Sequence, residues 1–409
     1  MDKGYTTKSL HVEFPQKDAY NALHMPVYDG VAYEFDSGED MEAAFTGKKI
    51  AHAYSRTSNP TVEYFEKKIK AVTDAHAVLA LSSGMAAISS AIISLVEKGA
   101  NIITSNHLFG HTFALFKETF PSLGIEVRFA DLNDVKSIKQ FTDEKTRVLF
   151  FETITNPQLE IADISMLSAF CREHNILLMC DSTTTPPNVF DAKKHGIDVE
   201  VMSTTKFISG GATAFGGIIA DHGTYNWNQL PALSKWTGKF KKDALIARLR
   251  KEVFRHLGGA MTAHTAHFMN IGLDVMALRV DKIVDNCIKL GEFLKTHPSV
   301  VEVNYPGIKN NVGYDLAVKQ FSGKPGGILS FDLESQLKCF SFMNRLMIIR
   351  RATNLNDNKT LIIHPYSTIY SEFSPEEREK MNVRDTMFRL SVGIEDVQDL
   401  IDDINQALG

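Results

Sequence analysis

Between residues 60 and 220, short apolar runs alternate with longer stretches of helical periodicity, and this alternation restricts the possible folds more than any other feature. The runs are continuously apolar, as expected of strands that are covered on both faces. They read AVLAL, NIITS, IEVRFAD, RVLFFET, ILLMCD and VEVMST. Strands that alternate with helices in this way form a mostly parallel sheet between two layers of helices. The sequence therefore predicts a large α/β domain.

The segments on either side of this region have other patterns. Residues 1 to about 55 lack periodicity and carry turn residues, so we expect an extended arm. Helical patterns dominate from about 241 to 298, and a smaller α/β unit follows with the strand candidates VVEVNYP, GGILSFDLES and MFRLSVGI. A length of 409 residues fits two or three structural units. We predict an N-terminal arm over 1–55, a large domain over 56–255 and a C-terminal domain over 256–409.

Charge and hydropathy argue against nucleic-acid and membrane partners. The net charge is −5, whereas nucleic-acid binders are usually basic. The basic stretch from Lys235 to Arg255 is better explained as a solvated helix face or a subunit contact than as a polyanion site. No segment approaches the ~18 apolar residues of a membrane span. The four cysteines, Cys171, Cys180, Cys287 and Cys339, show no C-x-x-C spacing. Cys180 lies in the apolar run ILLMCD, which indicates a buried thiol in a reducing, cytoplasmic compartment.

Polar residues close several of the apolar runs, and they are the candidates for a site. In open α/β sheets, ligands bind beyond the carboxyl ends of the strands. The candidates are Ser82, Ser83 and Gly84 after AVLAL, Glu152 after VLFF, Asp181 after ILLMC, and Ser203 to Lys206 after VEVM.

The stretch SSGMAA places a serine cap and a glycine at the start of a helix. Free N–H groups and the positive end of the helix dipole make such a start suitable for phosphate. Taken alone, these residues are better explained as a plain helix start. The chain has neither G-x-x-x-x-G-K-[ST] nor G-x-G-x-x-G, so nucleotide-binding loops are not predicted.

Asp181 and Lys206 complete a set of three groups. A carboxylate at the end of an apolar strand is costly unless a cation compensates it, although Asp181 could also cap the following turn. Lys206, at the end of another apolar strand among hydroxyl residues, suits a Schiff-base lysine. Pyridoxal phosphate (PLP) has a phosphate, a ring nitrogen that needs an acid and an aldehyde that needs an amine. The sequence therefore predicts PLP as the cofactor.

Metal binding is not predicted. His107 and His111 are spaced i, i+4 but lack the glutamate of an H-E-x-x-H site, and His264 with His267 is an isolated pair. Ordinary core or surface histidines account for both pairs.

Six motifs, in order from residue 54 to 396, resemble the Cys/Met-metabolism family of PLP enzymes. They are YSRTSNPT, SSGMAA, LFGHTFALF, ETITNP, STTKFISGG and RLSVGIED. The resemblance implies the aspartate-aminotransferase-like fold type I and a homotetramer of catalytic dimers. It also implies that Lys206 carries the cofactor, that Asp181 contacts the pyridine nitrogen, and that Arg389 binds the substrate carboxylate, as its guanidinium fork allows.

The same resemblance implies further site residues. Around the phosphate it implies Ser83, Gly84, Met85, Ser203 and Thr205, with Tyr54 and Arg56 reaching the phosphate of the neighbouring subunit. Phe109 would stack on the cofactor ring, and Asn156 and Asn354 would join Arg389 at the substrate. Lys206, Tyr54 and Phe109 are the predicted catalytic side chains.

The chain most resembles the O-acetylhomoserine sulfhydrylase branch, because Asn354 stands where lyases and synthases have serine and His111 where methionine γ-lyases have cysteine. This branch replaces the acetate of O-acetylhomoserine by sulfide or a thiol. A γ- or β-lyase of methionine, cystathionine or cysteine is the alternative, and a PLP-binding protein without turnover is a third. Phe109 replaces the tyrosine usual in the family and Ser182 an asparagine, which leaves the acid that assists the leaving group unassigned.

Overall fold

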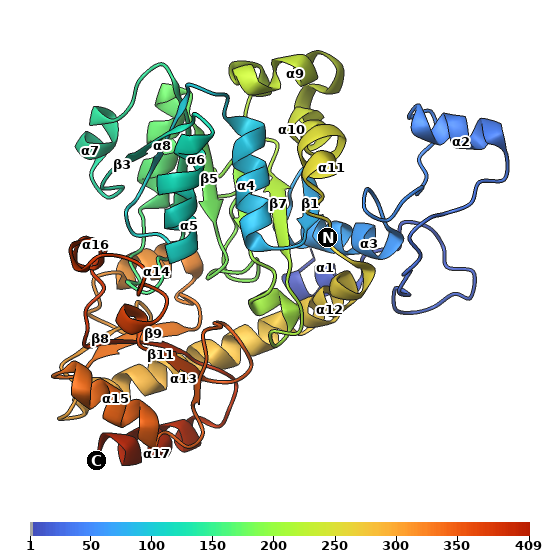
Figure 1. The fold of residues 1–409 in the computed structure, drawn as a ribbon. Helices are drawn as coiled ribbons and strands as arrows, with labels where there is room; N and C mark the ends of the chain where they lie inside the picture. Colours follow the sequence, from blue (N-terminus) through green and yellow to red (C-terminus); the bar gives the residue numbers. More distant parts are fainter. Residues whose placement is uncertain (1–2) are drawn as a thin grey trace.

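The computed structural model describes residues 3–409, which form two β-sheets covered by helices and a projecting N-terminal arm (Figure 1). The larger sheet has the strand order β1-β7-β6-β5-β4-β2-β3. Its strands are β1 (Ala77–Leu81), β2 (Asn101–Thr104), β3 (Glu126–Phe129), β4 (Thr146–Glu152), β5 (Leu177–Asp181), β6 (Val199–Met202) and β7 (Gly217–Asp221). Only β7 runs against its neighbours β1 and β6, so the predicted mostly parallel sheet is confirmed.

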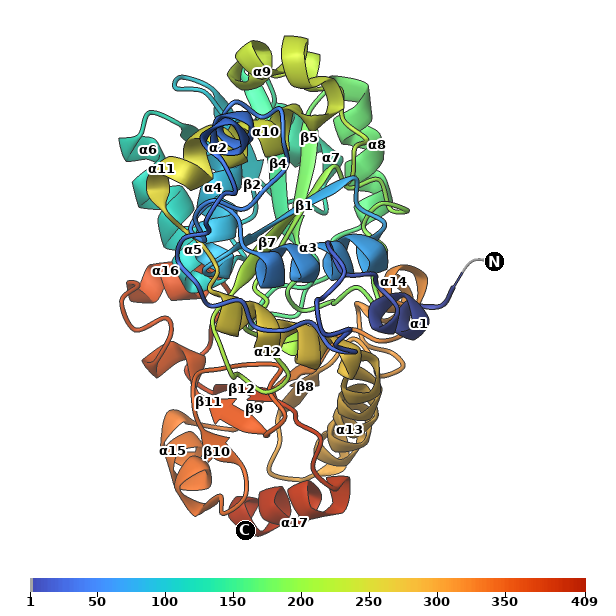
Figure 2. The same cartoon turned by 90° about the vertical axis from the view of Figure 1, so that its right-hand side faces the viewer.

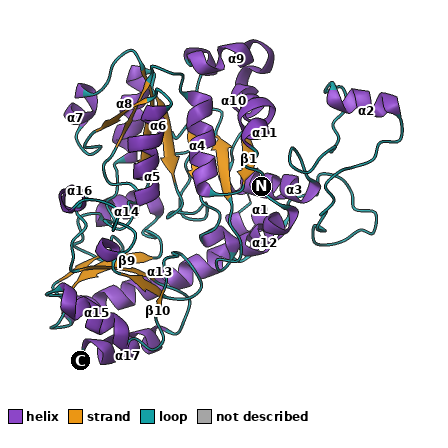
Figure 3. Ribbon diagram, in the orientation of Figure 1, coloured by secondary structure: helices purple, strands orange, loops and turns teal. Residues whose placement is uncertain are grey.

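Helices cover both faces of this sheet, which explains why its strands are continuously apolar (Figure 3). One face packs against α3 (Pro60–Thr73), α7 (Val135–Gln140) and α8 (Ile164–His174). The other face packs against α4 (Gly84–Leu95), α5 (Gly110–Ala114), α6 (Phe120–Ser122), α10 (Ala244–Arg248) and α11 (Phe254–Leu257), with α9 (Ser234–Phe240) beside α10. Side chains of alternate strand positions enter the two cores, as the pleat requires.

The chain then passes through α12 (Ala263–Asp274) and α13 (Met276–Thr296) to a second sheet with the order β10-β11-β12-β9-β8. Its strands are β8 (Glu302–Asn304), β9 (Ile328–Asp332), β10 (Arg350–Arg351), β11 (Leu361–Ile363) and β12 (Met387–Ser391). Its other helices are α14 (Tyr314–Phe321), α15 (Gln336–Arg345), α16 (Pro375–Lys380) and α17 (Val397–Leu408). The domain divide predicted between 255 and 256 falls inside α11 and stays a prediction.

Short 3₁₀ and π segments join these elements. They are η1 (Leu115–Thr119), η2 (Phe207–Ser209), η3 (Trp227–Gln229), η4 (Pro231–Leu233), η5 (Lys241–Asp243), η6 (Leu249–Val253) and η7 (Pro365–Ser367). Among residues 3–409, no helix is long and apolar enough to cross a membrane.

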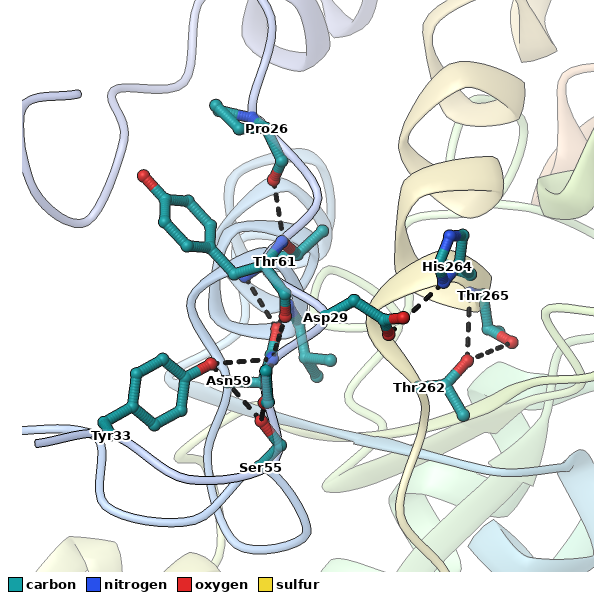
Figure 4. A network of polar contacts seen from close by, with 12 residues as sticks. Pro26, Asp29, Tyr33, Ser55, Asn59, Thr61, Thr262, His264 and Thr265 are labelled. Atoms are coloured by element: carbon teal, nitrogen blue, oxygen red, sulfur yellow. Dashed lines mark hydrogen bonds and ion pairs between the residues drawn. The ribbon is translucent and has the colours of Figure 1, made fainter. Parts of the chain in front are cut away.

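The N-terminal arm contains two short helices, α1 (Tyr5–Leu10) and α2 (Gly38–Phe45), and otherwise irregular backbone that runs beside α3 and α12 (Figure 2). Asn59 anchors it: its amide donates to the Tyr28 carbonyl at 2.7 Å and to the hydroxyls of Tyr33 and Ser55 at 3.1 Å each. Thr61 donates to the Pro26 carbonyl at 2.8 Å (Figure 4). These bonds fix the course of the arm up to the start of α3.

Candidate active site

Lys206 lies just past the end of β6, where the chain turns into η2. Its Nζ atom donates a hydrogen bond to the Asn354 Oδ1 atom at 2.9 Å. Burial is the main cause that lowers the pKa of Lys206, to about 8, and the charge of Arg389 lowers it further. Asp357 and Asp181 act in the opposite direction. The amine is thus less strongly protonated than an ordinary lysine, as a nucleophile or base requires.

Arg389 comes from β12 of the second sheet and is 1% exposed. Its Nη2 atom donates to the carbonyls of Thr353 at 2.9 Å and Asn354 at 3.0 Å, and its Nη1 atom to Asn156 Oδ1 at 3.4 Å. The buried Nε atom has no partner. Burial lowers the pKa of Arg389 to about 10. A cation held by neutral acceptors, with one donor unused, is suited to bind an anionic group.

Asn354 therefore connects the two sheets at the site. Its side chain accepts from Lys206 and donates to Asp357 Oδ2 at 3.1 Å, while its carbonyl accepts from Arg389. The structure brings Lys206, Asn354, Arg389 and Asn156 together, as the sequence predicts, although their roles stay predictions.

Asp181 ends β5, and its carboxyl accepts from the Thr183 N–H at 2.9 Å. Thr183 in turn accepts, through its hydroxyl, from the Ser203 N–H at 2.8 Å. The turn after Asp181 thus links the acid to the segment that carries Lys206. Burial is the main cause that raises the pKa of Asp181 to about 6; the hydrogen bonds from Thr183 oppose the rise, and the nearby charge of Glu200 adds to it.

This shift predicts a stability effect. An aspartate whose pKa is raised from 3.8 to about 6 on folding binds its proton more tightly in the folded protein, so stability is lost as the pH rises through 6. Asparagine has no charge to bury, so at pH 8 the cofactor-free Asp181→Asn variant should be more stable than the unmodified protein by about 3 kcal/mol. Urea unfolding at several pH values tests this. The two proteins should converge near pH 4, and a constant difference at all pH values would contradict the titration of Asp181.

Glu152 is a member of the site that the strand-end rule indicates but to which the sequence assigns no role. It ends β4 directly beside Asp181 in the sheet register. Its Oε1 atom accepts from the Phe109 N–H at 2.7 Å, which fixes the start of α5. Burial and the charge of Asp181 raise its pKa. Glu152 also lines a cavity of about 760 Å³ that lies next to this end of the sheet.

Sequence reasoning missed two further residues of the site. The Tyr370 hydroxyl donates to the carbonyls of Asn156 at 3.0 Å and Leu108 at 3.2 Å, and Asp357 holds the Asn354 amide. Both belong to segments of the second sheet whose patterns show no local signal, so only the packing of the two sheets reveals them.

The start of α4 packs directly on the segment that precedes Lys206. The Ser83 side chain caps the helix by accepting from the Ala86 N–H at 3.1 Å. A Cβ atom on Gly84 would lie 2.6 Å from Ser203 Cβ, and one on Gly217 would lie 2.1 Å from the Ser83 carbonyl oxygen. The first N–H groups of α4, which have no partner inside the helix, are therefore brought close to Ser203.

Three further residues that the sequence predicts at the site, Thr205, Met85 and Phe109, contact other parts of the protein. The Thr205 hydroxyl bonds to the backbone of Gly216, donating to its carbonyl at 3.3 Å and accepting from its N–H at 3.1 Å. Met85 accepts from the Thr112 hydroxyl through sulfur at 3.8 Å. The Phe109 ring packs on His111, edge to face, at 5.2 Å between centroids.

Tyr54 and Arg56 stand apart from this group. Both are exposed, and Arg56 donates to the Arg255 carbonyl at 2.8 Å. Within residues 3–409, no hydrogen bond joins either of them to the segments around Lys206. Their predicted role at a neighbouring subunit stays a prediction.

Pyridoxal phosphate fits the groups that the structure brings together. The Lys206 amine has a lowered pKa, Asp181 is held at a strand end on the same edge of the sheet, and α4 begins beside Ser203. The Nε atom of Arg389 has no hydrogen-bond partner and can donate to an anion other than the cofactor phosphate. Within residues 3–409, no three His, Cys, Asp or Glu side chains are placed to hold a metal ion.

Comparison with known proteins gives consistent results. The family described as Cys/Met metabolism PLP-dependent enzyme matches residues 6–409. O-acetyl-L-homoserine sulfhydrylase 1 of Thermus thermophilus is 34% identical over 99% of both chains. L-methionine gamma-lyase of Pseudomonas putida is 32% identical over 99% of this chain and 97% of its own.

Two solved structures are similar to the chain. A Campylobacter jejuni protein with a pyridoxyl-lysine-5'-monophosphate superposes with a TM-score of 0.94 and 32% identity, covering 99% of this chain and 100% of its own. An O-acetylhomoserine sulfhydrylase of the methionine biosynthetic pathway of Wolinella succinogenes has a TM-score of 0.79 and 44% identity, covering 87% of this chain and 99% of its own.

Proposed function

The chain belongs to the Cys/Met metabolism family of PLP-dependent enzymes, and from that premise we propose that it catalyses a γ-replacement on O-acetyl-L-homoserine. Acetate would be displaced by sulfide or a thiol, and with sulfide the product would be homocysteine, a precursor of methionine. The fold and the PLP dependence predicted from the sequence are confirmed by the family match and the superposition.

The observation that supports this proposal is the place of Asn354. Its amide oxygen accepts from the Lys206 amine at 2.9 Å, and its carbonyl accepts from Arg389 at 3.0 Å. Position 354, where this chain has the asparagine that is typical of the sulfhydrylase branch, therefore lies at the centre of the site. Overall identity does not separate the activities, because a sulfhydrylase at 34% and a methionine lyase at 32% are almost equally similar.

Arg389 would hold the substrate by its α-carboxylate. Its buried guanidinium has an unused Nε donor, and Asn156 is within reach of its Nη1 atom at 3.4 Å. Bound PLP supplies an electron sink that makes the hydrogen on the α-carbon acidic. Arg389 would fix the orientation in which that hydrogen is presented to Lys206.

Lys206 would move the protons. With a pKa lowered to about 8, about a tenth of the free amine is neutral at pH 7, far more than of an ordinary lysine, and can accept a proton from the α-carbon. Acetate leaves from Cγ, so a second proton must be removed from Cβ, which the same amine can do once it has passed on the first proton. The Asn354 oxygen holds the amine between these transfers.

The Phe109 ring has no proton to give to the leaving group. Because acetate leaves readily as an anion, no strong acid is needed, and Phe109→Tyr should change kcat by less than about threefold, a change of well under 1 kcal/mol in the barrier. Steady-state kinetics with O-acetylhomoserine and sulfide check this. Phe109→Leu, which removes the ring, is the control and should lower cofactor affinity. A large change in kcat for the tyrosine variant would contradict this account of acetate release.

The proposed function is tested by incubating the purified protein with homoserine esters and sulfide. Homocysteine formation from the acetyl ester is expected. The lyase alternative predicts an α-keto acid and ammonia from methionine, cystathionine or cysteine without any added thiol. Unchanged absorption of bound PLP on addition of any of these amino acids would favour a protein without turnover. Parallel reactions with succinyl and phosphoryl esters, and with methanethiol, define the acyl group and sulfur donor.

We also propose a homotetramer of catalytic dimers. Tyr54 and Arg56 lie away from their own Lys206, and the arm that leads to them exposes large apolar side chains: Tyr20 is 92%, Leu23 89% and Ile50 98% exposed. Such side chains are normally covered in an assembly. Light scattering of the full chain tests the assembly.

A cytoplasmic location, suggested by four cysteines that are all free and buried, stays a prediction.

A further inference from the structure

Glu200 is a carboxylate inside an otherwise apolar strand. It lies in β6 between Val199 and Val201 and is 1% exposed. The sheet register places it beside Cys180 of β5 and Ala220 of β7. A buried carboxylate is unfavourable unless cations or hydrogen-bond donors compensate it, so its partners indicate why it is there.

The two oxygens of Glu200 contact two side chains that directly follow the neighbouring strands β5 and β7. The Ser182 hydroxyl donates to Oε1 at 2.5 Å, and His222 Nε2 lies 3.2 Å from Oε2. Ser182 and His222 are 0% and 2% exposed. The three residues form a linear chain of polar contacts, which ends at His222 because the other ring nitrogen of His222 has no partner.

Ser182 connects this chain to the candidate active site. It stands between Asp181, whose carboxyl accepts from the Thr183 N–H, and Thr183, whose hydroxyl accepts from the Ser203 N–H. Paired strand residues share a face and successive ones alternate, so Glu200 lies on the opposite face of the sheet from Asp181. The Ser182–Glu200 hydrogen bond therefore holds the 181–183 turn from the face of the sheet opposite to Asp181.

We propose that Glu200 and His222 are a positioning pair, which acts through the Ser182 hydroxyl to hold the 181–183 turn and thereby orients Asp181 toward the pyridine nitrogen of bound PLP. The pair itself touches neither cofactor nor substrate. This inference rests on the cofactor site and not on which amino acid the enzyme converts.

The first test is Ser182→Ala, which removes the connection and leaves the Glu200–His222 pair in place. Two quantities are measured: the affinity of the cofactor-stripped protein for PLP, and the absorption spectrum of the holoenzyme, which responds to the hydrogen bonding of the ring nitrogen. Affinity is expected to fall about tenfold, equivalent to ~1.4 kcal/mol, and the spectrum to change. Ser182→Thr, which keeps the hydroxyl, should restore both.

Ser94→Ala is the matched control. Ser94 is 0% exposed, and its hydroxyl donates to the Ser90 carbonyl at 2.7 Å near the far end of α4, so it loses a comparable bond without contacting the turn. It should leave both cofactor readouts unchanged. If Ser182→Ala bound PLP with the affinity and spectrum of Ser94→Ala, the proposal would be overturned.

Glu200→Gln distinguishes positioning from general stabilisation. If Glu200 acts through Ser182, the substitution lowers PLP affinity in the unmodified protein but adds little in the Ser182→Ala background. An equal effect in both backgrounds would show that the pair acts independently of Ser182 and would sink the proposal. Because neither readout requires turnover, failure of the homocysteine assay would leave this test interpretable.

Discussion

Replacement of Lys206 by alanine should lower kcat by about a thousandfold or more, because the same amine is proposed both to hold the cofactor covalently and to move two protons. Its Nζ atom is 2.9 Å from Asn354 Oδ1 and its pKa is lowered to about 8, so the substitution removes a partly deprotonated amine from the site. Borohydride reduction in the presence of PLP, followed by mass spectrometry, gives a second readout. The unmodified protein should gain one reduced pyridoxyl group at Lys206, and the variant none.

Lys359→Ala is a suitable control, since Lys359 is exposed and belongs to the segment that carries Asn354 and Asp357. It should retain both the covalent group and turnover. A pyridoxyl adduct of unchanged yield in the Lys206→Ala protein would mean that another amine carries the cofactor.

Arg389→Lys is expected to lower kcat/KM by about a hundredfold, mainly through KM. Lysine keeps the charge but not the planar fork, so it cannot donate to Thr353 and Asn354 while presenting further N–H groups to a carboxylate. Two lost bonds to a charged group at ~1.5 kcal/mol each correspond to roughly this factor. Initial rates at several substrate concentrations separate KM from kcat.

The same substitution at Arg384 is the matched control. Arg384 binds both oxygens of Asp332, at 2.9 and 2.6 Å, and makes no contact with Lys206 or Asn354. Arg384→Lys should lower stability without raising KM. Equal kinetic losses in the two variants would show that the effect at Arg389 is structural rather than due to substrate binding.

The main sheet and half of the site could be predicted because their signals are local. Continuous apolar runs indicate buried strands, and the polar residue that ends each run, such as Asp181, must lie at the same edge of the sheet. The serine cap at Ser83 also has a local signature. The short helix α2 was missed in an arm predicted as extended, although Ser37 and the acidic residues Glu39 and Asp40 are a helix start signal.

The rest depends on contacts between distant segments. Asn354 meets Lys206 although 148 positions separate them, and the sequence does not place the second sheet against the first without a family resemblance. Strand β7 was not among the six predicted strands, and its reversed direction was equally hidden, because an apolar run shows burial but not orientation. Glu200 looks anomalous in an apolar strand, yet only Ser182 after β5 and His222 after β7 reveal how it is compensated.

The hydrogen bonds around Asn354 also affect how the protein unfolds. They join Lys206, which follows a strand of the larger sheet, to Arg389, which belongs to the smaller one. Ligands that bind between these groups stabilise the arrangement in which both sheets are folded and in contact. Calorimetry should therefore record a more cooperative melting transition in the liganded enzyme, with the two sheets losing structure together, than in the cofactor-free chain.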